Sequence, residues 1–205
     1  MIAIIDFGMG NLGSVYNMFK WLGYHNAIIT ADLEQIKASD KLVLPGVGSY
    51  KMAMDNLKNG GYLPILEQKV NHEHVPCMGI CLGMQLLFER SEEGDCDGLG
   101  YIKGKVVRFN FDNEEKKIRI PHIGWNFVDI NKKSAIVEDM FSENRFYFVH
   151  SYHAKCEDEE DILMTTNYGY NFASGVEKNN IYGFQFHPEK SHKYGKRIFE
   201  NFLKI

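Results

Sequence analysis

The chain has 205 residues, of which 44% are hydrophobic and 24% charged, and its formal net charge is −4. These values are typical of one soluble globular domain, here taken as residues 1–205, and they favour neither a nucleic-acid partner nor a membrane span. The four cysteines do not resemble a disulfide framework and the N-terminus does not resemble a secretory signal, so we expect a cytoplasmic protein with reduced thiols.

The first ninety residues alternate short apolar runs with amphipathic stretches. Strands separated by single helices indicate βαβ units, and these predict a mostly parallel, doubly wound α/β sheet flanked by helices. The expected strands are 2–6, 27–30, 41–44 and 75–80, and the expected helices are 12–22, 50–57, 63–70 and 82–90.

After residue 98 the pattern changes to extended segments without a strong helix between them. We therefore expect the α/β core to be followed by a β-rich second half with mixed or antiparallel pairing, and by a closing helix. The expected strands are 101–109, 118–129, 145–150, 162–166 and 181–187, and the helix is 191–203.

The segment 79–83, Gly-Ile-Cys-Leu-Gly, has the form glycine-x-nucleophile-x-glycine and lies between an expected strand and an expected helix. A sharp turn there leaves no room for side chains beside the nucleophile, which explains the glycines. The Cys81 sulfur would lie near a helix N-terminus, whose dipole favours thiolate over thiol. A buried structural cysteine is the alternative, and this is our interpretation of Cys77. We predict that Cys81 is a nucleophile.

A second motif, His187-Pro188-Glu189, ends an expected strand. Pro188 favours an extended conformation at His187, and the turn that it introduces lets Glu189 reach back to the imidazole. A cysteine nucleophile needs such a pair, a base for the thiol and a carboxylate that fixes the tautomer of the base. Alone, the tripeptide is often only a turn. Together with Cys81 it predicts a Cys-His-Glu triad.

A glycine-rich turn, Pro45-Gly46-Val47-Gly48, follows the third expected strand. Glycines at a strand end leave backbone N–H groups free to face a developing oxyanion. We expect the N–H groups of Val47 and Leu82 to do so. A plain strand-to-helix turn explains the same glycines equally well.

Taken together, the segments 45–48 (PGVG), 79–87 (GICLGMQLL) and 185–191 (QFHPEKS) resemble class I, or triad-type, glutamine amidotransferases. Within that family the chain is most similar to the glutaminase subunits of imidazole glycerol phosphate synthases. The segments that carry this finer resemblance are 5–12 (IDFGMGNL), 121–126 (PHIGWN) and 147–152 (YFVHSY), and the resemblance covers essentially the whole chain.

The resemblance implies a class I glutamine amidotransferase-like, flavodoxin-like fold. It also implies hydrolysis of glutamine to glutamate and ammonia through a thioester on Cys81, with no cofactor and no metal. Ammonia released into water would be protonated and lose its nucleophilicity, so the resemblance further implies a heterodimer with a (β/α)8-barrel cyclase of histidine biosynthesis. The implied substrate contacts are Gly48, Gln85, Ser151 and Tyr152, and the implied partner contacts are Asn11, Trp125, Asn126 and Tyr147.

Three alternatives stay open from the sequence. Gly13 stands where the histidine-pathway proteins usually carry arginine, and similar changes occur in paralogues that supply ammonia to sugar-modifying enzymes of surface polysaccharide synthesis. The run 8–13 also satisfies G-x-G-x-x-G, with Asp32 about twenty residues further on, which is typical of a dinucleotide-binding module. A catalytically idle regulatory subunit would keep the same fold. Histidine pairs such as His150 and His153 do not complete a zinc-type spacing.

Overall fold

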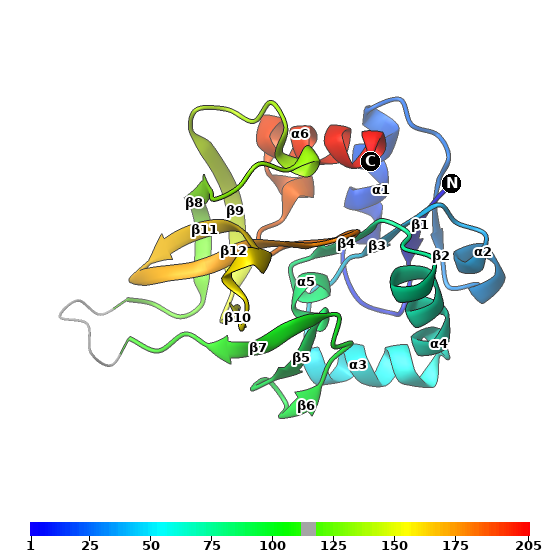
Figure 1. Cartoon of the computed structure of the whole chain (residues 1–205), viewed down its shortest axis with the longest axis horizontal. Coiled ribbons are helices and arrows are strands. Elements are labelled where there is room, and N and C mark those ends of the chain that lie inside the picture. The colour runs from blue at the N-terminus through cyan, green and yellow to red at the C-terminus, as the bar shows by residue number, and fades with distance from the viewer. Residues whose placement is uncertain (112–117) are drawn as a thin grey trace.

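The computed structural model of the chain describes residues 1–111 and 118–205. Its N-terminal half is built from strands and helices that alternate along the chain (Figure 1). The strands are β1 (Ile2–Ile5), β2 (Ala27–Thr30), β3 (Lys41–Leu44) and β4 (Cys77–Ile80). The helices are α1 (Leu12–Trp21), α2 (Leu33–Lys37), α3 (Tyr50–Asn59), α4 (Tyr62–Glu67), its π-helical continuation η1 (Gln68–His72), and α5 (Leu82–Leu86).

The second half is rich in strands, as the sequence predicts, and ends in one long helix, α6 (His192–Lys204). Its described residues also form the short 3-10 helices η2 (Ala135–Val137), η3 (Glu159–Asp161) and η4 (Pro188–Lys190). Its strands are β5 (Phe88–Ser91), β6 (Cys96–Asp97), β7 (Ile102–Arg108), β8 (His122–Ile130), β9 (Asn144–His150), β10 (Tyr152–Cys156), β11 (Ile162–Tyr168), β12 (Tyr170–Lys178) and β13 (Ile181–Phe184).

One sheet runs through both halves in the order β2-β1-β3-β4-β13-β12-β10-β7-β5-β6. Pairing is parallel from β2 to β13 and antiparallel from β13 to β7, which confirms the predicted parallel core and mixed second half. The strands β8, β9 and β11 form an extension that joins the sheet through β12 (Figure 1).

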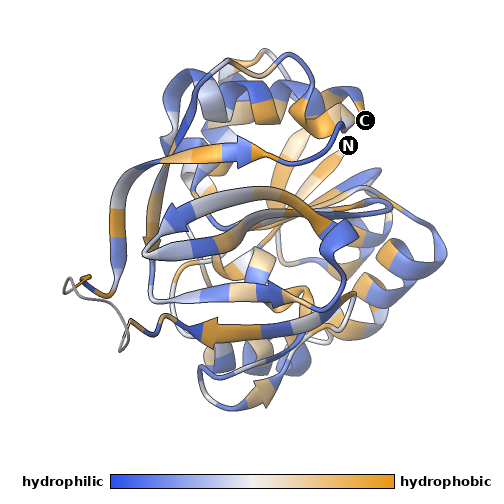
Figure 2. Ribbon diagram, turned by 60° about the vertical axis from the view of Figure 1, so that its left-hand side comes forward, coloured by the Kyte–Doolittle hydropathy of each residue, from blue (hydrophilic) through white to orange (hydrophobic). Residues whose placement is uncertain are grey.

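The core consists of two apolar layers, one on each face of the sheet. Successive residues of a strand point to opposite faces, so in β1 Ala3 and Ile5 belong to one layer, and Ile2 and Ile4 to the other. The first layer packs against α2, α3, α4 and α5, and the second against α1 and α6. Hydrophobic segments accordingly occur both in the strands and in the helices that cover them (Figure 2).

The prediction of a helix over 82–90 is wrong beyond Leu86, where α5 ends. The residues from Leu86 to Phe88 are buried, as are those of α5. Their carbonyls accept hydrogen bonds from the N–H groups of residues 99–102, and the chain continues as β5 beside β7. Long-range backbone pairing therefore overrides the local helical pattern. The sequence also missed the short helix α2 and the strands β6, β10 and β12. Among the described residues there is no helix long and apolar enough to cross a membrane.

The glycines of segment 79–83 permit a close approach between α5 and its neighbouring strands. A Cβ atom at Gly83 would lie 1.8 Å from the carbonyl oxygen of Leu44, and one at Gly79 would lie 2.7 Å from the carbonyl oxygen of Gly83. Both obstacles are backbone atoms of buried segments, which cannot rotate away. The turn after β4 therefore requires glycine for steric reasons, as the sequence predicts.

We expect Gly83→Ala to lower the free energy of unfolding by about 3 kcal/mol, since it overpacks a buried backbone contact. Gly13→Ala is the matched control, because nothing lies within 4 Å of a Cβ at that helical position. This control should raise stability by about 0.5–1 kcal/mol through its helix propensity. Urea unfolding of the two variants and the wild type measures both effects. Equal midpoints for Gly83→Ala and wild type would contradict the steric argument.

Candidate active site

Three strand ends meet at one edge of the sheet. β4 pairs in parallel with β3 on one side and with β13 on the other. Since the carboxyl ends of parallel strands share an edge, the segments that follow β3, β4 and β13 come together there. These segments are the turn 45–48, Cys81 and His187. The structure thus gathers the three motifs that lie far apart in the sequence.

Cys81 occupies a strained turn between β4 and α5. Its backbone has φ 53° and ψ −108°, a conformation that a residue with a side chain adopts at a cost of about 1–3 kcal/mol. Two backbone bonds hold it: the Cys81 N–H donates to the carbonyl of Phe184 (2.7 Å), and the Gln85 N–H donates to the carbonyl of Cys81 (3.1 Å). The turn has the strained strand-to-helix geometry that the sequence predicts for a nucleophile elbow.

His187 and Glu189 form a buried pair at the end of β13. Nδ1 of His187 lies 2.7 Å from Oε1 of Glu189, and only 2% of either side chain is exposed. The carboxylate can only accept, so Nδ1 carries a proton and Nε2 is the atom available to Cys81. His187 is extended (φ −99°, ψ 93°), as expected before proline, and its N–H donates to the carbonyl of Tyr147 (2.9 Å).

The protonation of His187 reflects two opposing influences. Burial disfavours the imidazolium and lowers the pKa of His187, whereas the interactions with Cys81 and Glu189 favour it. The two acidic neighbours prevail and raise the pKa to about 10. Among the described residues, Nε2 of His187 has no hydrogen-bond partner besides this interaction with Cys81. His187 is therefore protonated at neutral pH and able to donate a proton.

A cavity of about 250 Å³ lies over the elbow, and Cys81 is one of its lining residues. Its size suits a small amino acid rather than a polymer. The residues predicted to bind substrate or to form the oxyanion site all line it. These are Val47, Gly48, Leu82, Gln85, Ser151 and Tyr152.

Glu93 is a lining residue that the sequence did not single out. It is half-buried, its Oε2 accepts the N–H of Tyr50 (3.3 Å), and its own N–H donates to Oγ of Ser91 (3.0 Å). Burial raises the pKa of the Glu93 carboxyl, and the bond from Tyr50 opposes this. An ionised carboxylate in this cavity can pair with an ammonium group. In the sequence Glu93 was one of several charges in a loop, and nothing in the loop distinguished it.

Gln185 is a second buried residue that sequence reasoning missed. Its side chain is fully buried beside the elbow, and Nε2 lies 3.7 Å from Sγ of Cys81. Its Oε1 accepts from Nε2 of Gln85 (3.0 Å), and the same nitrogen donates to the carbonyl of Tyr152 (2.9 Å). The signal in the sequence was a glutamine within an apolar strand end, where an amide must find buried partners.

The residues predicted to face a partner do not all lie on one surface. Trp125 and Tyr147 are cross-strand neighbours in β8 and β9, with ring centroids 6.3 Å apart. Asn11 is exposed at the start of α1. Asn126 follows Trp125 and points to the other side of β8, where its Nδ2 contacts Nε2 of His122 (3.2 Å) and the carbonyl of Asn167 (3.0 Å).

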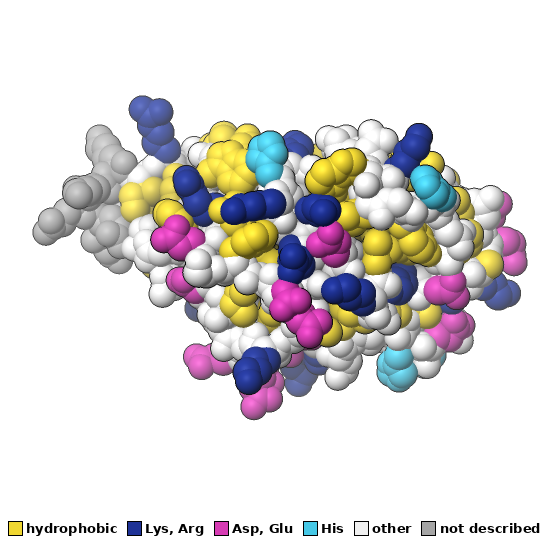
Figure 3. All heavy atoms as spheres, turned by 90° about the horizontal axis from the view of Figure 1, so that it is seen from above, with side chains coloured by type: hydrophobic (Ala, Val, Ile, Leu, Met, Phe, Trp, Pro, Cys, Tyr) yellow, Lys and Arg dark blue, Asp and Glu magenta, His cyan; other side chains and the backbone are white. Residues whose placement is uncertain are grey.

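The outer side of β8 carries an exposed hydrophobic row. Ile123, Trp125 and Phe127 alternate along the strand and are 59%, 40% and 52% exposed. Trp125 stacks on His192 (5.5 Å), and the guanidinium of Arg145 lies 4.9 Å from the Phe127 ring. Such a row is typical of a protein-binding surface. On the face seen in Figure 3, lysine and arginine side chains lie among acidic and hydrophobic ones.

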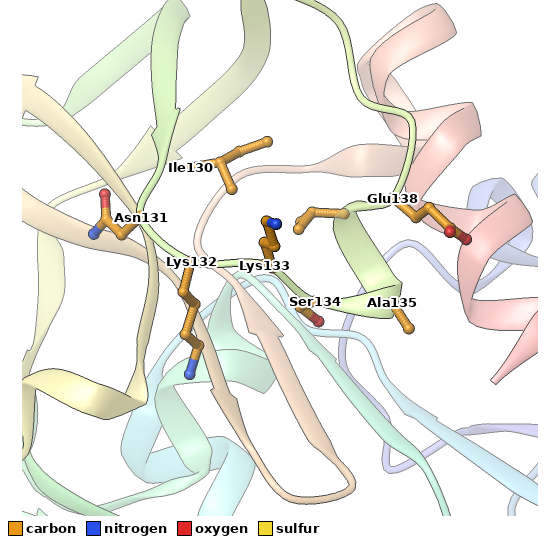
Figure 4. A pocket seen from close by; sticks show the side chains of 8 residues that line it. Ile130, Asn131, Lys132, Lys133, Ser134, Ala135 and Glu138 are labelled. Atoms are coloured by element: carbon orange, nitrogen blue, oxygen red, sulfur yellow. The ribbon is translucent and has the colours of Figure 1, made fainter.

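A larger hollow, of about 770 Å³, lies along residues 130–138 between β8 and η2 (Figure 4). The side chains of Lys132 and Glu138 point to different sides of it, and Nζ of Lys132 donates to the carbonyls of Glu160 and Glu177. Its lining residues include neither cysteine nor histidine. Cys81, the predicted nucleophile, lines the smaller cavity.

The G-x-G-x-x-G run at 8–13 has a structural explanation. A Cβ at Gly10 would lie 3.2 Å from the backbone nitrogen of Gly46, and one at Gly48 would lie 2.6 Å from the side chain of Met9. The run therefore packs against the turn that follows β3. The carboxylate of Asp32 accepts the N–H of Glu34 (2.8 Å) and caps α2. Both features have roles in the fold that do not involve a dinucleotide.

A family model described as glutamine amidotransferase class-I matches residues 3–205. The imidazole glycerol phosphate synthase subunit HisH 2 of Methanococcus maripaludis is 53% identical over 204 residues, covering 100% of this chain and 99% of that one. The subunit HisH of Sulfurimonas denitrificans is 48% identical, with coverage of 100% and 98%. A crystal structure of a glutamine amidotransferase has a TM-score of 0.77 at 16% identity, covering 99% of this chain and 97% of that one, and shows the same fold.

Proposed function

Because the chain belongs to the class I glutamine amidotransferases, we propose that it is the glutaminase subunit of an imidazole glycerol phosphate synthase. The observation that carries the proposal is the buried His187–Glu189 pair beside Cys81, at the edge where β4 and β13 end. The names of the relatives described above support the synthase and its place in histidine biosynthesis. The single-domain boundary and the cytoplasmic location expected from the sequence stay predictions.

The proposed reaction is the hydrolysis of glutamine in two steps. The thiolate of Cys81 attacks the carboxamide carbon, and the carbonyl electrons move onto oxygen. Protonated His187 then donates its Nε2 proton to the departing nitrogen, so that ammonia leaves and a γ-glutamyl thioester remains on Cys81. Neutral His187 takes a proton from water, which attacks the thioester and releases glutamate. Glu189 keeps Nε2 directed at the sulfur throughout.

The negative charge that develops on the substrate oxygen needs backbone donors. The first N–H groups of a helix have no partner within the helix, and Leu82 opens α5 in the wall of the cavity. Val47 lies in the turn after β3 and lines the same cavity. We assign the oxyanion site to these two N–H groups.

The α-ammonium group of glutamine is assigned to Glu93. We expect Glu93→Gln to raise KM for glutamine by about 10- to 100-fold, because a charged hydrogen bond contributes about 1.5–3 kcal/mol. The kcat should change much less, since Glu93 does not contact the reacting carboxamide. Glu92→Gln is the matched control: this residue is the exposed neighbour, and it does not line the cavity. Steady-state glutamate release measures both parameters. An unchanged KM would show that another group binds the ammonium.

Ammonia loses its nucleophilicity when it is protonated in water, so the product must pass directly to a second active site. The synthase named for the relatives implies a second subunit, and we propose that this subunit is a (β/α)8-barrel cyclase that forms a heterodimer with this chain. The exposed row on β8 is the proposed contact surface, together with Asn11 and Tyr147. Gly13, where the sequence departs from arginine, is exposed on α1 and does not touch the triad.

We expect Trp125→Ala to weaken binding of the cyclase by about 30-fold or more, as for a buried aromatic hot spot worth about 2 kcal/mol. The second tryptophan, Trp21, provides the control, since it is 67% exposed at the far end of α1 from Asn11. Titration calorimetry with the cyclase gives both affinities. If both variants lost the same affinity for the cyclase, the interface would not include the row on β8.

The direct test of the proposed function is glutamate release from glutamine by the purified chain, with and without the cyclase and its ribonucleotide substrate. We expect release that increases when both are present. If glutamate release increases only with a sugar-modifying partner, the glutaminase reaction stands, but the pathway is surface polysaccharide synthesis instead of histidine biosynthesis. The absence of release under every condition would contradict the proposal and favour a catalytically idle subunit.

A further inference from the structure

A chain of buried and partly buried hydrogen bonds connects Asn126 to the cavity. Nδ2 of Asn126 lies 3.2 Å from Nε2 of His122, and Nδ1 of His122 lies 2.9 Å from Nε2 of His150. Nδ1 of His150 lies 2.8 Å from the carbonyl oxygen of Tyr152, and both His150 and Tyr152 line the cavity. His122 and His150 are 3% and 6% exposed. They face each other across β8 and β9, where they are register partners.

The two ends of this chain fix its direction. The Tyr152 carbonyl can only accept, so Nδ1 of His150 carries the proton and Nε2 of His150 accepts from His122. At the other end, Oδ1 of Asn126 accepts the N–H of Phe127 (2.8 Å) and Nδ2 donates to the carbonyl of Asn167, which orients the amide. Nδ2 must therefore donate to Nε2 of His122. Both ends demand the same tautomer, with the proton on Nδ1 of each histidine.

This arrangement is complete only when both imidazoles are neutral. A second proton on His122 would face the Asn126 amide hydrogens, and a second proton on His150 would face the His122 N–H. Burial lowers the pKa of His122 to about 4. Burial lowers the pKa of His150 to about 3, with the nearby histidines 122, 153 and 187 acting in the same direction. The chain is thus complete across the neutral pH range.

The Tyr152 carbonyl joins the chain to the amide of Gln85. It accepts from His150 and also from Nε2 of Gln85 (2.9 Å), whose second hydrogen goes to Oε1 of Gln185 (3.0 Å). Both hydrogens of the Gln85 amide are therefore used inside the protein, and only its oxygen remains for a ligand in the cavity. Gln185 in turn reaches Sγ of Cys81. Any movement of the Tyr152 carbonyl disturbs the Gln85 amide.

We propose that Asn126, His122 and His150 are positioning residues, whose one-directional hydrogen-bond chain fixes the Tyr152 carbonyl and thereby the Gln85 amide for binding glutamine. The proposal rests on the proposed function for the identity of the ligand. None of the three residues transfers a proton in the reaction. The hydrogen-bond chain instead sets the positions of Tyr152 and Gln85 in the cavity wall, so its loss weakens substrate binding more than it slows the chemical step.

The kinetic test compares His122→Phe with wild type. Phenylalanine keeps the stacking that His122 makes with Phe148 (4.7 Å) and Tyr168 (4.0 Å), but it removes both hydrogen bonds. We expect KM for glutamine to rise about tenfold and kcat to fall less than threefold. His122→Asn, which keeps a donor near the position of Nδ1, should recover part of the KM loss. An unchanged KM, or an equal loss in the Asn variant, would overturn the proposal.

His153→Phe is the matched control. His153 is a buried histidine, and its ring contacts Phe109, as do the rings of His122 and His150. Its nitrogens, however, contact the carbonyl of Ala154 and the hydroxyl of Tyr170. His153→Phe should change the KM for glutamine less than twofold. Release of glutamate by the wild type, measured first, tests the proposed function separately. If the wild type is active and His122→Phe raises KM no more than His153→Phe does, only the positioning role is lost.

A second measurement does not depend on activity. Nitrogen NMR of the ¹⁵N-histidine-labelled protein at pH 7 reports the tautomer of each imidazole. We expect His122 and His150 both to be neutral with the proton on Nδ1, and to stay so on acidification to about pH 5. A proton on Nε2 of either ring, or protonation of either ring at pH 7, would overturn the directional chain.

Discussion

Cys81→Ser is expected to lower glutamine-dependent synthesis by the complex about 10⁴-fold or more, while synthesis from added ammonium salts stays within about twofold of wild type. The hydroxyl of serine is far less acidic than a thiol, and His187 at this site holds a proton instead of accepting one. In the proposed complex the acceptor chemistry takes place on the cyclase and does not need the sulfur. Product formation with each nitrogen source measures the two activities side by side.

Cys77→Ser provides the control, since Cys77 is fully buried four residues before the nucleophile and does not line the cavity. Burial raises the pKa of its thiol to about 12, so it is not a thiolate at neutral pH. The folded Cys77→Ser protein should keep its glutamine-dependent activity. If Cys81→Ser lost synthesis from glutamine and synthesis from ammonium salts equally, this result would contradict the proposed division of labour between the two chains.

The sequence was most informative where a local residue pattern is enough to determine the backbone conformation. The strands 27–30 and 41–44 have the predicted bounds, because short β-branched and aliphatic runs between polar turns strongly prefer the extended conformation. The strained turn at Cys81 was equally predictable, since a turn packed against backbone requires glycine at positions 79 and 83. The gathering of segments 45–48, 81 and 187 then follows from parallel pairing alone.

What could not be predicted depends on contacts between distant segments. β5 looked helical because its pairing with β7 has no local signature. Glu93 resembled any exposed loop charge until the fold placed it in the wall of the cavity. His122 and His150 lie 28 residues apart, and only the register of β8 and β9 brings their rings together. Buried polar networks of this kind are properties of the tertiary structure.

Glu189→Gln is the second change with a large expected effect, and it tests how His187 holds its proton. Glutamine has nearly the same shape, but its amide can donate to Nδ1 and so favour the wrong tautomer. We expect kcat/KM for glutamine to fall about 10³- to 10⁴-fold, as for the corresponding change in a serine-type triad. Since the Glu189 carboxylate helps to raise the pKa of His187 to about 10, its removal must lower that pKa.

The pH profile shows whether this reasoning holds. In the wild type His187 stays protonated up to about pH 10 and can donate to departing ammonia throughout the neutral range. In Glu189→Gln the imidazolium loses its proton at lower pH, so the alkaline limb of kcat/KM should move down by at least about one unit. Glu200→Gln removes a carboxylate that pairs with Lys196 and Arg197 on α6, and it should leave the limb in place. A Glu189→Gln profile that coincides with that of Glu200→Gln would mean that Cys81 alone keeps His187 protonated.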